Sequence, residues 1–312
     1  MRHSSPSAVR LTLSVSLAAI LFEILFPETA LAWSYWILLL AVVVVGIPHG
    51  AIDHIIAGKM FRLSDSWRRK FWFNALYLGL MLIVVAVWLI HPVAGLMFFL
   101  IMSVYHFGQA DMEDFLSPEA RHSLWYVMRG LFVVGLIVFT DTRVSFAIIA
   151  QATGLEPASV SSAVPEAGLV IPLLFAAYAL VFGYAAATGR LARRRHFLYD
   201  SLLVGVVFIV TGPIVGFAVY FALWHSTGHI MEMQRYLHRH KVAMPLPAFY
   251  KAATPHTLIS FIALGVLVGV VHVFAMDDRF VALMLILISV LTLPHMAIVD
   301  RMYRQQEPGT VL

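Results

Sequence analysis

Apolar residues occur in long runs along this chain, and short polar segments separate the runs. A helix needs about twenty mostly apolar residues to cross the hydrocarbon core of a bilayer. The pattern therefore predicts an all-α, polytopic transmembrane bundle of about ten spans: 11–26, 33–47, 71–90, 93–107, 124–140, 169–187, 197–212, 213–230, 257–274 and 280–299. The runs 197–212 and 213–230 meet at Gly212-Pro213 and are short for spans, so the helix boundaries around 197–231 stay open.

We predict a single integral membrane domain over residues 1–312. The first apolar run, 11–26, follows Arg2 and Arg10 and resembles a secretory signal. Because another apolar run follows at once, we expect an uncleaved first helix that acts as a signal-anchor, although Ala30-Leu31-Ala32 offers a cleavage site. Residues 141–166 are the least apolar stretch, and we expect an extracytoplasmic loop there with a short interfacial helix.

The basic residues test this topology. Ten spans place all but three of the 21 Lys and Arg residues on one side of the membrane, the exceptions being Arg129, Arg143 and Arg279. Cytoplasmic loops carry an excess of Lys and Arg. We therefore predict a multi-pass protein of the cell (inner) membrane, embedded in the lipid bilayer, with both the N- and the C-terminus cytoplasmic.

The composition excludes several kinds of site and partner. The chain is 61% hydrophobic and 12% charged, which is typical of a membrane protein. It contains no cysteine, which excludes disulfides, iron–sulfur clusters, thiolate zinc sites and cysteine nucleophiles. The net charge of +4 arises in short loops between apolar spans, and we expect no nucleic acid as a partner.

Histidines supply the strongest candidate chemistry. His225 and His229 stand four residues apart, so a helix would place both on one face, where they could bind one transition metal. Five histidines fall at the predicted cytoplasmic ends of four spans: His49, His106, His225, His229 and His295. Polar residues at one shared depth predict a converging polyhistidine site. Neutral imidazole suits iron, zinc, copper and nickel.

Carboxylates follow three of these histidines: Asp53, Asp111 and Asp300. An aspartate that accepts the second ring N–H of a histidine ligand fixes its tautomer, and the i,i+4 spacing of His49 and Asp53 fits this best. For Asp111 and Asp300 a solvated position at a helix exit is equally compatible with the sequence.

Aromatic residues lie beside the histidines, among them Tyr105, Phe107 and Trp224. Singly, each fits ordinary lipid-facing packing or an interfacial belt. Together, next to a metal, they would suit an elongated apolar substrate that arrives through the bilayer.

Four short motifs resemble those of the Brp/Blh family of bacterial and archaeal membrane β-carotene dioxygenases, and they occur in the family's order. They are GIPHGAID from Gly46, YHFGQAD from Tyr105, HSTGH from His225 and LPHMAIVD from Leu293. The motifs extend from residue 46 to residue 300. The first helix and the acidic loop after Asp111 carry none of them.

The resemblance implies a carotenoid dioxygenase with Fe(2+) as cofactor and His49, His106, His225 and His229 as iron ligands. It implies oxidative cleavage of the central double bond of all-trans-β-carotene by O2, which gives two molecules of all-trans-retinal. We expect His295 to contact the iron ligands rather than the iron itself. A retinal-binding rhodopsin is a candidate partner for the product.

Two other classes stay open. A membrane di-iron hydroxylase or desaturase also uses H-x3-H, but such enzymes need H-x2-H-H motifs, and this sequence has none. A non-enzymatic haem-binding protein or metal transporter would also place histidines in helices. Haem would show as a Soret band, and a transporter would more naturally carry carboxylates deep in its spans.

Overall fold

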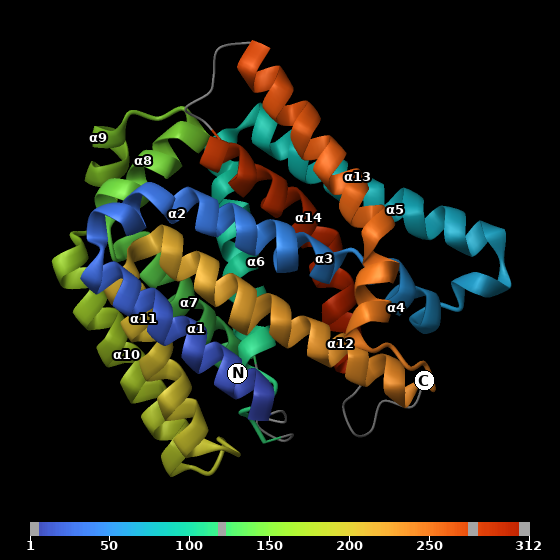
Figure 1. Cartoon of the computed structure of the whole chain (residues 1–312), viewed down its shortest axis with the longest axis horizontal. Coiled ribbons are helices and arrows are strands. Elements are labelled where there is room, and N and C mark those ends of the chain that lie inside the picture. Colours follow the sequence, from blue (N-terminus) through green and yellow to red (C-terminus); the bar gives the residue numbers. More distant parts are fainter. Residues whose placement is uncertain (1–5, 118–122, 274–279, 306–312) are drawn as a thin grey trace. The chain divides into compact units, whose positions relative to one another are not determined.

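The computed structural model describes residues 6–117, 123–273 and 280–305, and over these residues the fold is helical (Figure 1). The elements, in chain order, are α1 Pro6–Leu25, α2 Pro27–Ala41, η1 Val42–Gly46, α3 Ile47–Gly50, α4 Asp53–Met60, η2 Leu63–Asp65, α5 Trp67–Ile90, α6 Pro92–Met112, α7 Ser123–Phe139, α8 Thr142–Thr153, α9 Pro157–Ser162, α10 Ala167–Ala187, α11 Arg194–Tyr220, η4 Phe221–Ser226, α12 Thr227–Arg239, α13 Leu246–Val273 and α14 Phe280–Arg304. The predicted all-α class is confirmed for this part of the chain.

Seven helices among the described residues are long and apolar enough to cross a membrane. Counting the bent pair α7 and α8 as one span gives up to eight. Ten spans therefore stay a prediction. So does the cytoplasmic side of the two chain ends, because the length and composition of the helices assign no side; residues 1–5 and 306–312 also lie outside the described residues. The predicted loop 141–166 contains two short helices, α8 and α9.

Helix α11 is a hairpin rather than one straight rod. Gly212 has a φ of 68° and a ψ of −173°, outside the helical region, and Pro213 follows it. The Trp224 indole N–H donates to Asp200 over 2.8 Å. In a continuous α-helix these two residues would stand about 36 Å apart, at about 1.5 Å per residue. The chain thus reverses at Gly212, and the predicted break between 197–212 and 213–230 is confirmed.

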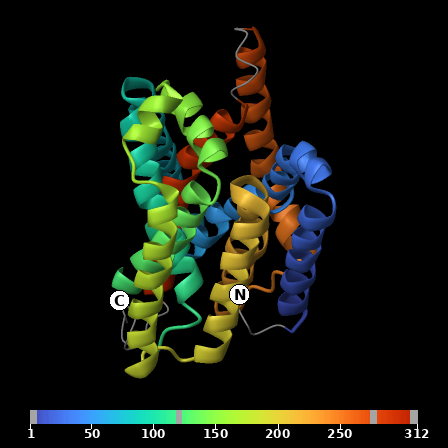
Figure 2. The same cartoon turned by 90° about the vertical axis from the view of Figure 1, so that its left-hand side faces the viewer.

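The described residues divide into two compact units, each built from three segments of chain. The first unit comprises Met1–Gly46, Ser103–Ala150 and Leu155–His229, and the second comprises Ile47–Met102, Gln151–Gly154 and Ile230–Leu312. In the first unit α11 packs against α1, α2 and α7, and α10 covers α7 (Figure 2). In the second unit α14 packs against α5, α4 and α13. The Trp88 indole N–H ties α5 to α14 through Ser289.

Two glycines let α6 and α7 cross at backbone contact. A Cβ on Gly108 would overlap the carbonyl of Tyr126, and a Cβ on Gly130 would overlap the carbonyl of Val104. Small residues at a crossing allow membrane helices to approach this closely. The crossing fixes the segment of α6 that carries His106.

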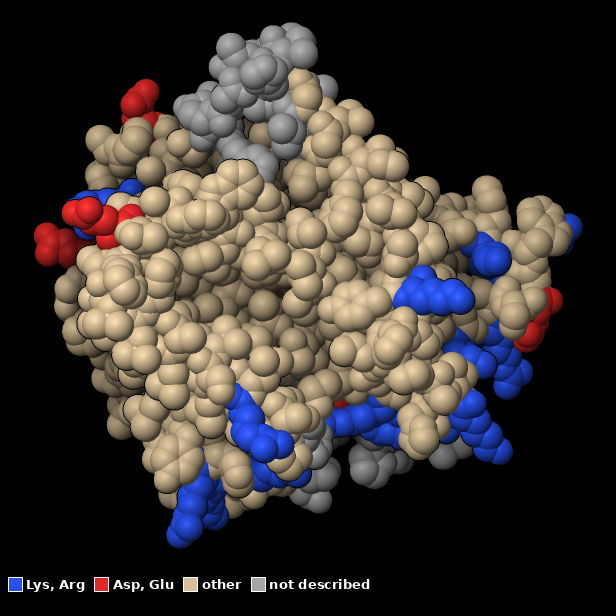
Figure 3. Space-filling view, in the orientation of Figure 1, with Lys and Arg blue, Asp and Glu red and all other residues tan. Residues whose placement is uncertain are grey.

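Large apolar side chains cover much of the surface. Leu180 on α10 is 75% exposed and Leu89 on α5 is 80% exposed. Most side chains visible in Figure 3 are neither Lys, Arg, Asp nor Glu. Water would make such exposure costly, whereas lipid tails accept it without penalty. The surface is therefore that of a membrane protein.

Candidate metal centre

Three imidazoles converge in the first unit. His106 comes from α6, His225 from η4 and His229 from α12, and all three are buried. One ligand nitrogen from each lies within 4.8 Å of the others. Ring centroids are 4.9 Å apart for His106 and His225, 5.0 Å for His106 and His229, and 4.6 Å for His225 and His229. These residues, three of the five histidines that the sequence analysis expects to converge, form the three-histidine cluster.

A π-helical turn presents His225 to the cluster. The segment Phe221–Ser226 is wound as η4, between the α-helical α11 and α12. The hydroxyl of Thr227 donates to the carbonyl of Ala222, five residues earlier, over 2.7 Å. A threonine in an α-helix usually bonds the residue three or four positions before it, so this bond follows the wider turn. Single π turns occur often at functional sites.

Aromatic rings enclose His225. Phe107 contacts it edge-on at 4.7 Å, and Phe221 stacks on it at 5.4 Å with an interplanar angle of 13°. Gly46 makes room for Phe221, because a Cβ there would come within 2.5 Å of the ring. Phe107 thus lies beside the histidines, while its role at a substrate site stays a prediction. Tyr105 instead lies against Tyr126, at 6.0 Å.

His49 and His295 lie together in the second unit. Their rings meet edge-on at 4.9 Å, and both are buried. Asp53 accepts hydrogen bonds from His295 Nδ1 (2.8 Å to Oδ1) and from the Tyr77 hydroxyl (3.0 Å). Since a carboxylate only accepts, its bond fixes the His295 proton on Nδ1. The sequence predicted His49 as the donor to Asp53; the structure shows His295, because the chain turns at 51–52 between α3 and α4.

The other two predicted carboxylates have different surroundings. Asp111 is buried and pairs with the guanidinium of Arg129, with 2.8 Å between Nε and Oδ2. Asp300 is partly exposed and accepts from Arg304, one turn further along α14, over 2.8 Å. Asp300 thus has the solvated helix-exit position that the sequence left open.

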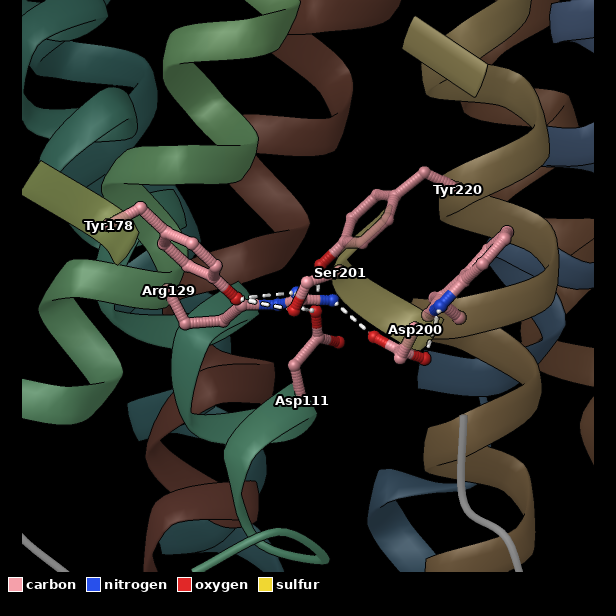
Figure 4. A network of polar contacts seen from close by, with 7 residues as sticks. Asp111, Arg129, Tyr178, Asp200, Ser201 and Tyr220 are labelled. Carbon is pink, nitrogen blue, oxygen red and sulfur yellow. Dashed lines mark hydrogen bonds and ion pairs between the residues drawn. The ribbon is translucent and has the colours of Figure 1, made fainter. Parts of the chain in front are cut away.

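Sequence reasoning missed a buried polar network around Arg129 (Figure 4). Arg129 also pairs with Asp200, at 2.7 Å, and Trp224 bonds that same carboxylate. The position of Arg129 inside the predicted span 124–140 was a signal for this network, because an ionisable residue inside a span marks a functional site by default. Neither the partner Asp200 nor the binding mode of Trp224 follows from spacing alone.

The three-histidine cluster fits a transition metal. Its potential ligand atoms are imidazole nitrogens, which iron, zinc, copper and nickel accept. Metal–imidazole bonds of about 2.1 Å allow ligand nitrogens up to about 4.2 Å apart, which is close to the 4.8 Å limit within which the cluster nitrogens lie. The described residues contain one such group of three potential ligands.

The fold and the cluster define a helical membrane protein with a buried histidine site suited to a metal. Residues 40–303 match the family described as beta-carotene 15,15'-dioxygenase, and the chain belongs to that family. It is thus an enzyme of the dioxygenase class, and the predicted family is confirmed.

Two curated relatives are similar to this chain. A Halobacterium salinarum protein named "Probable beta-carotene 15,15'-dioxygenase Blh" is 29% identical over 295 residues, which cover 86% of this chain and 84% of the relative. A protein of an uncultured marine bacterium named "Beta-carotene 15,15'-dioxygenase" is 25% identical over 278 residues, covering 86% and 94%. No solved structure matches the chain.

Proposed function

We propose that this enzyme cleaves the central double bond of all-trans-β-carotene with O2 and releases two molecules of all-trans-retinal. One C=C bond breaks and two C=O bonds form, so both oxygen atoms of O2 enter the two products. The family match and the names of the relatives support this reaction. The single structural observation that carries it is the three-histidine cluster, buried in an apolar helical protein.

We further propose Fe(2+) as the cofactor, bound by His106, His225 and His229. The resemblance adds His49 as a fourth ligand, and this remains a prediction. When bound, the iron would supply a redox-active centre at which O2 becomes reactive toward the polyene. Four neutral imidazoles would leave it open positions and contribute no anionic charge.

The side chains around the cluster hold the ligands and exclude water. Phe107 meets His225 edge-on and Phe221 stacks on its face, so the imidazole has little room to rotate. The cluster histidines are at most 2% exposed, so bulk water does not reach them. An apolar polyene needs no charged anchor, and burial and shape would determine its binding. It would enter from the lipid, which agrees with the proposed location in the cell (inner) membrane.

A pigment assay tests the reaction and its site together. The wild type, His225→Ala and His196→Ala would be expressed in a bacterium that accumulates β-carotene, and the pigments extracted for chromatography. His196 is an exposed histidine on α11 and serves as the matched control. Wild type and His196→Ala should bleach the cells and yield retinal. His225→Ala should reach the membrane in normal amount and yield none.

Each other outcome contradicts a defined part of the proposal. Retinal production by His225→Ala would refute the assignment of this ligand. Shorter apocarotenals from the wild type would move the cleavage to another bond. Orange cells with wild-type protein in the membrane would refute carotene cleavage. On purified protein, about two iron atoms per chain would favour a di-iron enzyme, and a Soret band would favour haem binding.

A further inference from the structure

Seven buried side chains meet at one point of the first unit, and we call this group the arginine cluster. Its members come from α6, α7, α10, α11 and η4: Asp111, Arg129, Tyr178, Asp200, Ser201, Tyr220 and Trp224. Figure 4 shows the Arg129 guanidinium between the two carboxylates, with the tyrosine and serine hydroxyls around it.

Arg129 binds its partners through all three nitrogens of its guanidinium. Nε donates to Asp111 and Nη2 donates to Asp200, over 2.8 and 2.7 Å. Nη1 donates to the hydroxyl oxygens of Tyr178 (2.9 Å) and Ser201 (3.2 Å). A planar fork of this kind fixes direction as well as distance. The carboxylates of Asp111 and Asp200 therefore have a defined position relative to each other.

Each carboxylate also holds the segment that carries His225. The Tyr220 hydroxyl donates to Asp111 over 3.1 Å, and the Trp224 indole donates to Asp200 over 2.8 Å. Trp224 directly precedes His225, inside the π turn. Asp111 lies five residues after His106 on α6. The arginine cluster thus links the helix that supplies His106 to the turn that supplies His225.

Burying three charges is expensive, and hydrophobic replacements of such groups are often as stable. Stability alone is therefore a weak reason for this arrangement. We propose that the arginine cluster positions His106 and His225 relative to each other for metal binding, with Trp224 and Tyr220 as its positioning residues. This inference rests on the proposed metal site, and it concerns the geometry of that site rather than the substrate.

Cobalt(II) is a suitable probe, because its visible absorption bands report the geometry of the metal's ligands and do not require turnover. The test uses purified, metal-free protein of the wild type, Trp224→Phe and Trp88→Phe. Phenylalanine keeps an aromatic ring and removes the indole N–H. Trp88 also donates a buried indole N–H, to Ser289 in the second unit, so Trp88→Phe is the matched control.

Trp224→Phe should bind cobalt about tenfold more weakly than the wild type and should show altered absorption bands. A loss of about tenfold is the lower end of the range for the removal of a group that orients a metal ligand. It should also lower kcat for β-carotene while KM changes little. Trp88→Phe should match the wild type in cobalt affinity and spectrum. Tyr220→Phe removes one hydroxyl and should alter the spectrum in the same way, so it carries the test if Trp224→Phe does not fold.

Wild-type cobalt affinity and spectrum in both Trp224→Phe and Tyr220→Phe would overturn the positioning role, as would a wild type that binds no cobalt. The outcomes separate this inference from the proposed function. Retinal production with spectra unchanged by the substitutions would leave the function standing and remove the positioning role. If the substitutions alter the cobalt spectrum but the wild type makes no retinal, the positioning role is supported and carotene cleavage is refuted.

Discussion

Replacing Gly108 by alanine should damage the proposed metal site without changing a proposed ligand. Gly108 lies where α6 crosses α7, and an added Cβ would overlap the backbone of Tyr126. No rotamer relieves this overlap, because the backbone of residue 108 fixes the position of the Cβ and the atoms it meets are main-chain atoms. The helices must separate or the crossing must shift. His106 precedes Gly108 by two residues, so it moves with the same turn of α6.

The size of the displacement follows from the contacts. The Cβ would lie 2.5 Å from the Tyr126 carbonyl carbon and 2.9 Å from the Gly130 nitrogen. Non-bonded carbon atoms need about 3.5 Å, so the carbonyl carbon alone requires α6 to move by about 1 Å, and the Tyr126 carbonyl oxygen, which lies closer still, requires more. Overpacking of this kind costs about 1–3 kcal/mol of stability. A 1 Å misplacement of a reacting group can lower activity about 100-fold, and we expect a loss of this order in retinal formation.

The assay compares Gly108→Ala with Gly183→Ala in membranes that hold equal amounts of protein. Gly183 lies in α10, where an added Cβ meets nothing within 4 Å. Alanine there should preserve activity and, by its better helix propensity, stability. We would measure iron per chain and retinal formed. Gly108→Ala with full iron content and wild-type activity would refute the argument that this close crossing sets the position of His106.

Two further substitutions test the buried polar groups. Arg129→Met leaves two buried aspartates without their cation and should lower the free energy of unfolding by about 3–5 kcal/mol. The exposed control Arg143→Met should change it little. Equal unfolding curves for the two variants would contradict the role of the paired network in stability. Asp53→Asn removes the charged acceptor of His295 Nδ1, whose ring meets that of the predicted ligand His49, and should lower retinal formation about tenfold. The exposed control Asp65→Asn should keep full activity, and an active Asp53→Asn would show that this hydrogen bond is dispensable.

The pairing of His225 and His229 could be predicted because its cause is local. A spacing of four residues places His225 and His229 on one face of any helix, and the burial of polar residues at one depth suggested His106 as their neighbour. The break at Gly212-Pro213 could be predicted for the same reason. Glycine readily adopts a positive φ and proline cannot donate to the helical ladder, so the sequence alone marks the position of the reversal.

The partners of the buried aspartates Asp53 and Asp111 could not be predicted, because they depend on which helices pack together. Asp53 has His49 four residues before it, yet the residue it binds is His295, 242 positions away. No periodicity within one segment contains that pairing. The π turns η1 and η4 were missed for a related reason. A π turn inserts one extra residue into an apolar helix, and the hydrophobic pattern of a helix buried on several sides hardly changes.

Arg129 shows how far a single sequence can be read at a membrane site. Its place within the span 124–140 marks it as a residue that needs anionic partners, and this much follows from the cost of a charge in hydrocarbon. The chain offers few carboxylates away from its loops, and Asp111 and Asp200 both lie near predicted span ends. The reversal at Gly212 brings Trp224 beside Asp200, and with it the segment of His225. Composition thus predicts that the charge is paired, whereas the topology of the hairpin determines that the pairing reaches the three-histidine cluster.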